Sequence, residues 1–311
     1  MTSRERVLAA IAHREPDRVP IDQGSMRSTG MMAITYNRLK EHLGVESGPA
    51  FLYDVVQQLA QPEEWFLERF HIDAIDIGRA ISAADARRPW TLPDGSCCAA
   101  PDWYGPEREP GGGLAFRNAD GVVVGRMPPG ALYMDQATWP LSGPTGLDDF
   151  EPLARKMEQV NWAAMPAAGY DKPLTEERLR EIGAIARRVH EGTDYAVSMS
   201  IGCSLLEWSQ FLFGMENTYA YIAGEKRKYG RFLDRLAEVH MEGLARLLPH
   251  VRGWVDILVV GDDLGMQSGP QMSPAAYREL FLPRHERIYR YAKELSGARL
   301  FMHCCGGVDR K

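Results

Sequence analysis

The second half of the chain alternates short apolar runs with longer amphipathic segments, and this order constrains the fold more than any other feature. The apolar runs predict three strands, at residues 194–201, 255–261 and 299–304. The amphipathic segments predict helices, at residues 174–191, 204–224, 226–250 and 273–295. Strands joined by helical crossovers form a parallel sheet, so the sequence predicts an α/β protein.

The first half of the chain follows this pattern less regularly. It predicts a capped helix from Thr2 or Ser3, a strand at 18–22, a helix that ends at Gly44, further helix over 50–70 and a buried strand at 72–78. Residues 85–145 are rich in Pro, Gly and Trp, and "LPDGS" and "NADGVVVG" are hairpin signals. We therefore expect a single domain over 1–311 that contains an irregular β-rich insertion at about 85–145.

Polar residues follow several of the predicted strands. Asp22 follows "RVPI", Asp262 and Asp263 follow "ILVVG", and His303 to Cys305 follow "LFM". In a (β/α)8 TIM barrel the carboxyl ends of the strands meet at one mouth, where the active site is built. We expect such a barrel, with about five of its strands in this chain. An open doubly wound sheet also places function at strand carboxyl ends and stays the alternative.

Composition narrows the class of partner. The chain has 42 Asp and Glu against 36 Lys and Arg, a net charge of −6, and no basic block, so we expect neither nucleic acid nor a membrane as partner. Without an apolar run of about 20 residues or a signal peptide, the sequence predicts a cytoplasmic protein with a small-molecule substrate. The five cysteines are predicted to be reduced thiols, with Cys97, Cys98 and Cys203 buried.

The stretch "HCCGG" is a candidate metal site. Side chains alternate along a strand, so His303 and Cys305 share one face and Cys304 points the other way. Imidazole and thiolate are common zinc ligands, and Gly306 and Gly307 allow a sharp turn beside them. A catalytic zinc site needs a third protein ligand. The alternative is a hydrogen-bonded core histidine beside cysteines that only pack.

Other candidate residues lie in "GDDLGMQSGP" and in the insertion. We predict Asp262 and Asp263 as catalytic residues, one of which caps the following turn while the other faces the site. Gln267 and Asp22 are predicted to bind substrate. Trp103 and Tyr104 in "PDWYGPE" are predicted to line a substrate pocket, although such aromatics also form the small core of an insertion.

Several motifs occur in the order seen in a known superfamily. They are "REPDRVPID", "STGMMAITYNRLKEHLG", "PDWYG", "WPLSG", "SLLEWSQFLFGMENTYAYI", "VDILVVGDDLGMQSGPQMSPAAYRELFLPRHERIY" and "LFMHCCGGV". The chain thereby resembles the uroporphyrinogen decarboxylase (URO-D) superfamily over its whole length, and is most similar to the cobalamin-dependent, zinc-type methyltransferase branch. The resemblance implies a TIM barrel.

The resemblance also implies a chemistry. His303 and Cys305 match the first two zinc ligands of the methyltransferase branch, and zinc would convert a thiol acceptor into the thiolate that takes a methyl group from a corrinoid (cobalamin) cofactor. A corrinoid protein would be the partner. The third family ligand is a later cysteine with no counterpart here, so we expect a C-terminally truncated barrel whose unclosed edge allows self-association.

Two other functions stay open at this stage. Within the same superfamily, the chain would be a uroporphyrinogen decarboxylase of porphyrin biosynthesis, which needs no metal. In another class, it would be a non-catalytic ligand-binding protein or an inactive truncated homologue, because the metal site is incomplete on the sequence alone.

Overall fold

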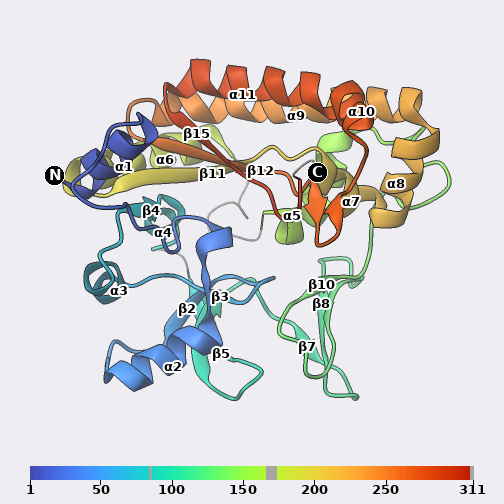
Figure 1. Ribbon diagram of the computed structural model, residues 1–311. Helices are drawn as coiled ribbons and strands as arrows, with labels where there is room; N and C mark the ends of the chain where they lie inside the picture. The colour runs from blue at the N-terminus through green and yellow to red at the C-terminus, as the bar shows by residue number, and fades with distance from the viewer. Residues whose placement is uncertain (84–85, 166–173, 309–311) are drawn as a thin grey trace. The chain divides into compact units, whose positions relative to one another are not determined.

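The computed structural model describes residues 1–83, 86–165 and 174–308 (Figure 1). Two compact units share the chain. Unit 1 comprises Met1–Thr138, Met165–Pro173 and Ile185–Ser198, and unit 2 comprises Trp139–Ala164, Leu174–Ala184 and Met199–Lys311. Among the described residues, no helix combines the length and apolar character needed to cross a bilayer.

Unit 1 contains short helices and mainly short strands. Its helices are α1 (Ser3–Ile11), a 3-10 turn (Arg27–Thr29), α2 (Ala33–Leu43), α3 (Glu64–Arg69) and α4 (Gly78–Ile81). Its strands are β1 (Met31–Met32), β2 (Ala50–Asp54), β3 (Leu59–Ala60), β4 (Ala74–Asp76), β5 (Arg87–Thr91), β6 (Cys97–Pro101), β7 (Glu107–Arg108), β8 (Leu114–Arg117), β9 (Val123–Met127) and β10 (Asp135–Gln136).

Unit 2 is mainly helical. Its helices are α5 (Leu153–Ala164), α7 (Leu206–Phe213), α8 (Met215–Gly224), α9 (Lys226–Val251), α10 (Pro274–Ala276), a π-helical turn (Tyr277–Phe281) and α11 (Leu282–Ser296). Its strands are β12 (Ile257–Gly261), β13 (Gly265–Met266), β14 (Gly269–Pro270) and β15 (Arg299–His303). Helix α6 (Glu176–Gly192) and strand β11 (Ala196–Gly202) contribute residues to both units.

Four strands form a parallel sheet in the order β15-β12-β11-β4. Ala196 of β11 pairs with Ala74 of β4, and Gly261 of β12 pairs with His303 of β15. These four strands overlap the apolar runs that predicted strands at 72–78, 194–201, 255–261 and 299–304, so the parallel α/β arrangement is confirmed for this part of the chain. The remaining described strands form three other sheets, of five, four and two strands.

The predicted TIM barrel is wrong. The described strands form several small sheets, both parallel and antiparallel, and none of these sheets is closed. Two segments also differ from the predicted secondary structure. The run 50–70, predicted as helix, instead forms β2 and β3, which pair antiparallel, followed by the short α3. The run 18–22 forms no strand.

A buried ion network explains why residues 18–22 form no strand. Arg18 and Arg6 bind the fully buried Asp73 at 2.6 and 2.7 Å. The backbone N–H of Ile21 donates to the same carboxylate at 2.8 Å. Val19 consequently lies 79% exposed. The segment "RVPI" is therefore held by the contacts of Arg18 and of the Ile21 backbone with Asp73, and its apolar residues do not form a strand.

The described residues of the segment 85–145 are rich in β-strands. Strands β5 to β10 lie between Arg87 and Gln136, and they belong to two mostly antiparallel sheets. The turn of "NADGVVVG" joins β8 and β9, where the Asn118 side chain accepts the N–H groups of Asp120 and Val122. Cys98 and Cys203 are buried as expected, whereas Cys97 is exposed, so the expected burial of Cys97 is wrong.

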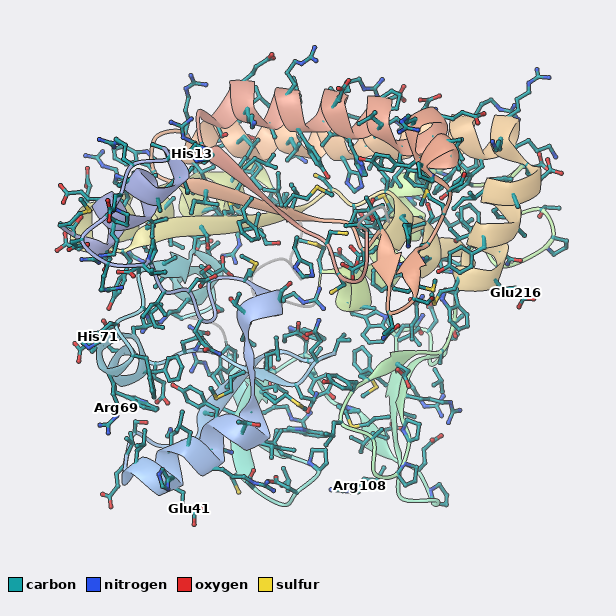
Figure 2. The ribbon with its side chains drawn as sticks, viewed as in Figure 1. His13, Glu41, Arg69, His71, Arg108 and Glu216 are labelled. Carbon is teal, nitrogen blue, oxygen red and sulfur yellow. The ribbon has the colours of Figure 1, made fainter. Side chains whose placement is uncertain are left out.

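An aromatic core holds unit 2 together. Phe213 of α7 and Phe232 of α9 have ring centroids 4.7 Å apart, and Tyr229 of α9 packs against Phe281 of the π-helical turn. All four side chains are less than 2% exposed. Helices α9 and α11 run alongside each other (Figure 1). This packing joins α7, α9 and the π-helical turn, and Figure 2 draws the side chains of the chain in the same view as Figure 1.

Candidate metal centre

The pairing of β12 with β15 brings two distant polar segments together. The strands are in parallel register, with Gly261 opposite His303 at their carboxyl ends. The N–H of Asp262 continues the ladder by donating to the His303 carbonyl at 3.1 Å. Asp263 and His303, which are 40 positions apart in the sequence, therefore emerge side by side.

Three potential ligand atoms converge at this edge. The His303 Nε2 atom lies 3.1 Å from the Cys305 Sγ atom and 3.5 Å from the Asp263 Oδ1 atom. One ligand atom from each of the three residues lies within 4.8 Å of the other two. Asp263 and His303 each keep about a third of the side chain exposed, and Cys305 is exposed. We call these three residues the triad.

The triad fits a tetrahedral metal ion such as zinc. Ligand atoms that bind zinc at about 2.0 to 2.3 Å lie about 3.3 to 3.8 Å from one another in a tetrahedron. The two distances from His303 fall at or near this range. Three protein ligands of the N, S and O types leave one position open, which is the arrangement of a catalytic site.

The backbone after β15 turns sharply to place Cys305. Gly306 has φ +83°, and a Cβ atom there would lie 2.4 Å from the backbone of Gly265 and Met266. Glycine alone avoids both the strain and the clash. The N–H of Gly307 then donates to the Met266 carbonyl at 3.0 Å. The hairpin formed by β13 and β14 thus fixes the segment that carries Cys305.

Cys304 points away from the triad, as the alternation of side chains predicts. Its sulfur accepts the N–H of Leu264 at 3.4 Å, whereas the Cys305 N–H donates to Asp263 Oδ1 at 2.7 Å. This second bond orients the Asp263 carboxylate. Loss of water around the Cys305 sulfur, and then the nearby Asp263 carboxylate, raise the pKa of that thiol. A bound cation would offset this repulsion between a thiolate and a carboxylate.

Asp262 has a different environment from Asp263. It is completely buried, and its carboxylate accepts the N–H groups of Leu205, Leu206 and Glu207 at 3.0 to 3.1 Å. These groups begin helix α7, where unpaired N–H groups favour an acidic partner. His285 of α11 also approaches it, with Nε2 at 3.0 Å. Of the two adjacent acids, Asp262 caps a helix and Asp263 faces the triad.

A glutamine supports the triad, but it is Gln271 and not Gln267. Gln271 Nε2 donates to the Asp263 carbonyl at 2.6 Å, and Gln271 Oε1 accepts from Gln210 and Tyr219. Gln267 lies exposed at the tip of the β13–β14 hairpin. Gln267 and Gln271 are close together in the sequence. The pairing of β13 with β14 puts Gln267 at the hairpin tip and Gln271 beside Asp263. The substrate role of Gln267 stays a prediction.

The remaining predicted site residues belong to unit 1. Asp22 accepts the Ser25 N–H at 3.1 Å and the Thr29 hydroxyl at 3.2 Å, so it stabilises a local turn. Tyr104 is completely buried, and its ring packs against Trp103 and Phe116. These two aromatics thus contribute to the small core of the insertion, the alternative that the sequence left open. Their proposed contact with substrate stays a prediction.

Comparison of the chain with family models, with curated proteins and with solved structures gives no match. The resemblance to the uroporphyrinogen decarboxylase superfamily therefore rests on the sequence motifs alone.

Proposed function

We propose that this protein is a zinc-dependent methyltransferase that moves a methyl group between a corrinoid and a thiol acceptor. The observation that carries the proposal is the convergence of Asp263, His303 and Cys305. The sequence supplied only two ligands, His303 and Cys305. Asp263 offers the third, so the donor set no longer depends on a later cysteine.

The donor set suits thiol chemistry. A zinc ion held by one carboxylate, one thiolate and one imidazole carries no net charge, and its open position would accept the sulfur of the substrate. When bound, the metal supplies Lewis-acid chemistry that lowers the pKa of that thiol and provides a thiolate at neutral pH. The residues of the chain have the positioning role: the Cys305 N–H orients Asp263, and Gln271 holds the Asp263 backbone.

The methyl donor is proposed from the resemblance. In such a reaction, the thiolate sulfur would take the methyl group from a methylcorrinoid, and the electron pair of the broken carbon–cobalt bond would stay on cobalt, which would pass from Co(III) to Co(I). The proton of the acceptor thiol goes to solvent. A corrinoid-carrying protein would be the natural donor, and free methylcobalamin is the practical substitute.

Metal analysis tests the centre. We expect about one equivalent of zinc per wild-type chain, and strongly reduced zinc in His303→Ala, Cys305→Ser and Asp263→Asn. Cys304→Ser is the matched control, because this thiol lies next to Cys305 but points at the Leu264 backbone. Zinc content that is the same in all four variants would refute the centre.

A separate assay tests the reaction. The protein is incubated anaerobically with methylcobalamin and 2-mercaptoethanol, and the visible absorption change from methylcob(III)alamin to cob(I)alamin is followed. We expect turnover that requires zinc and is lost in His303→Ala. A chain that binds zinc stoichiometrically but transfers no methyl group would keep the metal centre and reject the methyltransferase proposal.

A further inference from the structure

The β-rich segment between β5 and β10 contains a groove that the proposed metal chemistry does not use. Three turns of this segment line the groove, and its volume is about 220 Å³. An apolar cavity of about 150 Å³ holds one benzene ring, so the groove has room for a ring with a small substituent. Every residue that lines it belongs to unit 1, whereas the triad belongs to unit 2.

The three turns are each closed by a backbone hydrogen bond across four residues. The N–H donors and their carbonyl acceptors are Gly95 and Leu92 (2.9 Å), Gly112 and Glu109 (2.9 Å), and Ala131 and Pro128 (3.0 Å). Proline occupies the second position of all three turns, as Pro93, Pro110 and Pro129, where its fixed φ favours the turn. Turns of this kind are ordered before a ligand arrives, so binding costs little conformational entropy.

The lining of the groove is mainly apolar. The side chains of Leu92, Leu114 and Met127 are buried, at 9% exposed or less. Pro93 and Pro128 also line the groove but are exposed to solvent. A hydrocarbon ring placed against these side chains would remove further apolar surface from water, which favours binding.

Arg108 of β7 gives the groove a charge. Among the described residues that line it, only Arg108 is charged, and Figure 2 labels this side chain. The two neighbouring acids have other partners. Glu107 pairs with Arg117 at 3.3 Å, and Glu109 pairs with Arg126. No carboxylate among the described residues forms an ion pair with Arg108, so its guanidinium is available to an anion in the groove.

Asp94 lies between two residues of the lining, but its carboxylate stabilises the turn. It accepts the N–H and the hydroxyl of Ser96 at 3.1 and 2.7 Å, and it lies 3.6 Å from Arg38. The negative charge of Asp94 is therefore offset outside the lining, and the lining itself carries the positive charge of Arg108.

We propose that this groove binds a small monocarboxylate with an apolar ring, which packs on Leu92, Leu114 and Met127 while its carboxylate pairs with Arg108. A guanidinium suits a carboxylate because it can donate two parallel N–H bonds to the two oxygens. A single cation beside an apolar lining favours a monoanion over a polyphosphate.

NMR titration of the full-length chain, with isotope-labelled Leu and Met methyl groups, tests this site. Three probes of similar size differ in charge: benzoate is an anion, benzyl alcohol is neutral and benzylammonium is a cation. We expect benzoate to bind most tightly and to give nuclear Overhauser contacts to the methyl groups of Leu92 and Met127.

Substitution of Arg108 isolates the ion pair. Arg108→Gln removes the charge at an exposed position, so it should fold normally and weaken benzoate binding about fivefold, with benzyl alcohol binding unchanged. Arg108→Lys keeps the charge and should keep most of the benzoate affinity. Arg69→Gln, at an exposed position of α3 in the same unit, is the matched control and should bind benzoate as wild type does.

Three results would overturn the proposal. They are the absence of a saturable shift of the Leu92 and Met127 methyl signals with benzoate, equal benzoate affinity in wild type and Arg108→Gln, and tighter binding of benzyl alcohol or benzylammonium than of benzoate. The zinc content of Arg108→Gln should equal that of wild type, which separates this test from the tests of the metal centre.

Discussion

Asp76 should make the stability of the protein depend on pH in an unusual direction. The pKa of this carboxyl is raised from 3.8 to about 7 in the folded protein, chiefly by burial. Between these two values the folded state holds a proton that the unfolded state has lost. The free energy of unfolding therefore falls as pH rises from about 4 to about 7, and it levels off above the folded pKa.

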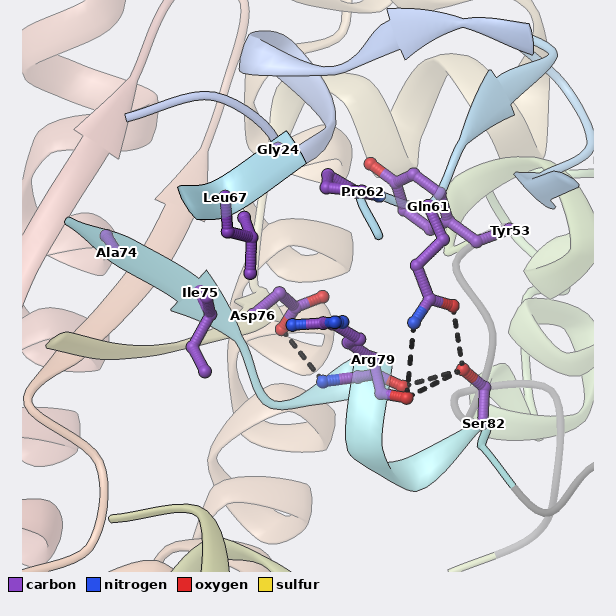
Figure 3. Close-up of a pocket in the computed structure, with 11 residues that line it drawn as sticks. Gly24, Tyr53, Gln61, Pro62, Leu67, Ala74, Ile75, Asp76, Arg79 and Ser82 are labelled. Carbon is purple, nitrogen blue, oxygen red and sulfur yellow. Dashed lines mark hydrogen bonds between the residues drawn. The ribbon is translucent and has the colours of Figure 1, made fainter. Parts of the chain in front are cut away.

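The size of the effect follows from the shift. At about 1.4 kcal/mol per pKa unit, a shift of about three units corresponds to about 4 kcal/mol over the whole range. Roughly 2 kcal/mol of this is already lost at pH 5, since that is about one unit above the unfolded pKa. Asp76 lines a surface pocket (Figure 3) and keeps some contact with solvent, which screens the charge. We therefore expect about 1 to 2 kcal/mol between pH 5 and pH 8.

Asp76→Asn measures this contribution directly. Asparagine keeps the oxygen that accepts the Gly78 N–H but cannot ionise, so the variant should gain stability relative to wild type as pH rises. Urea unfolding at pH 5, 6.5 and 8 gives the free energies. Asp102→Asn, at an exposed position, is the control and should show no such trend. A difference between Asp76→Asn and wild type that stays constant from pH 5 to pH 8 would refute the reasoning.

Two further predictions concern the frame of the metal centre. Asp262→Asn should lower the free energy of unfolding by about 3 kcal/mol, because the amide cannot accept from His285 and three backbone N–H groups together; a loss below about 1 kcal/mol in urea unfolding would contradict the capping role. Gly306→Ala should lower zinc affinity at least about tenfold, because it displaces Cys305. Gly44→Ala has a similar φ, +65°, but open space around it, so it should cost about 1 kcal/mol of stability and leave zinc affinity unchanged. Equal zinc affinity in both alanine variants would count against the fixed turn.

Local patterns predicted much of the fold. The apolar runs that became β11, β12 and β15 each follow a long amphipathic helix, so both the hydrophobic period and the segment lengths indicated the correct elements there. The run 50–70 misled the prediction, because "FLYDVV" is apolar without a clear period, and such a run suits a strand as well as a helix. The barrel prediction counted five apolar runs as equivalent strands, of which 18–22 forms no strand and the other four form one open sheet.

The candidate site was predictable only in part. The alternation of side chains correctly placed His303 and Cys305 together and Cys304 apart. The sequence could not show that β12 lies next to β15 in a register that brings Asp263 to His303, because strand order is a long-range property.

The register between β12 and β15 has a consequence for tolerance to insertions and deletions. Removal of one residue within β15, before His303, would bring the Cys304 side chain to the face now occupied by His303 and Cys305. The His303 and Cys305 side chains would then point away from Asp263. Removal of two residues would return the His303 and Cys305 side chains to their present face of the strand, but at a position two residues further along it. Length variation should therefore be tolerated around Gly253, where the turn before β12 has open space, and rejected between Arg299 and Gly307.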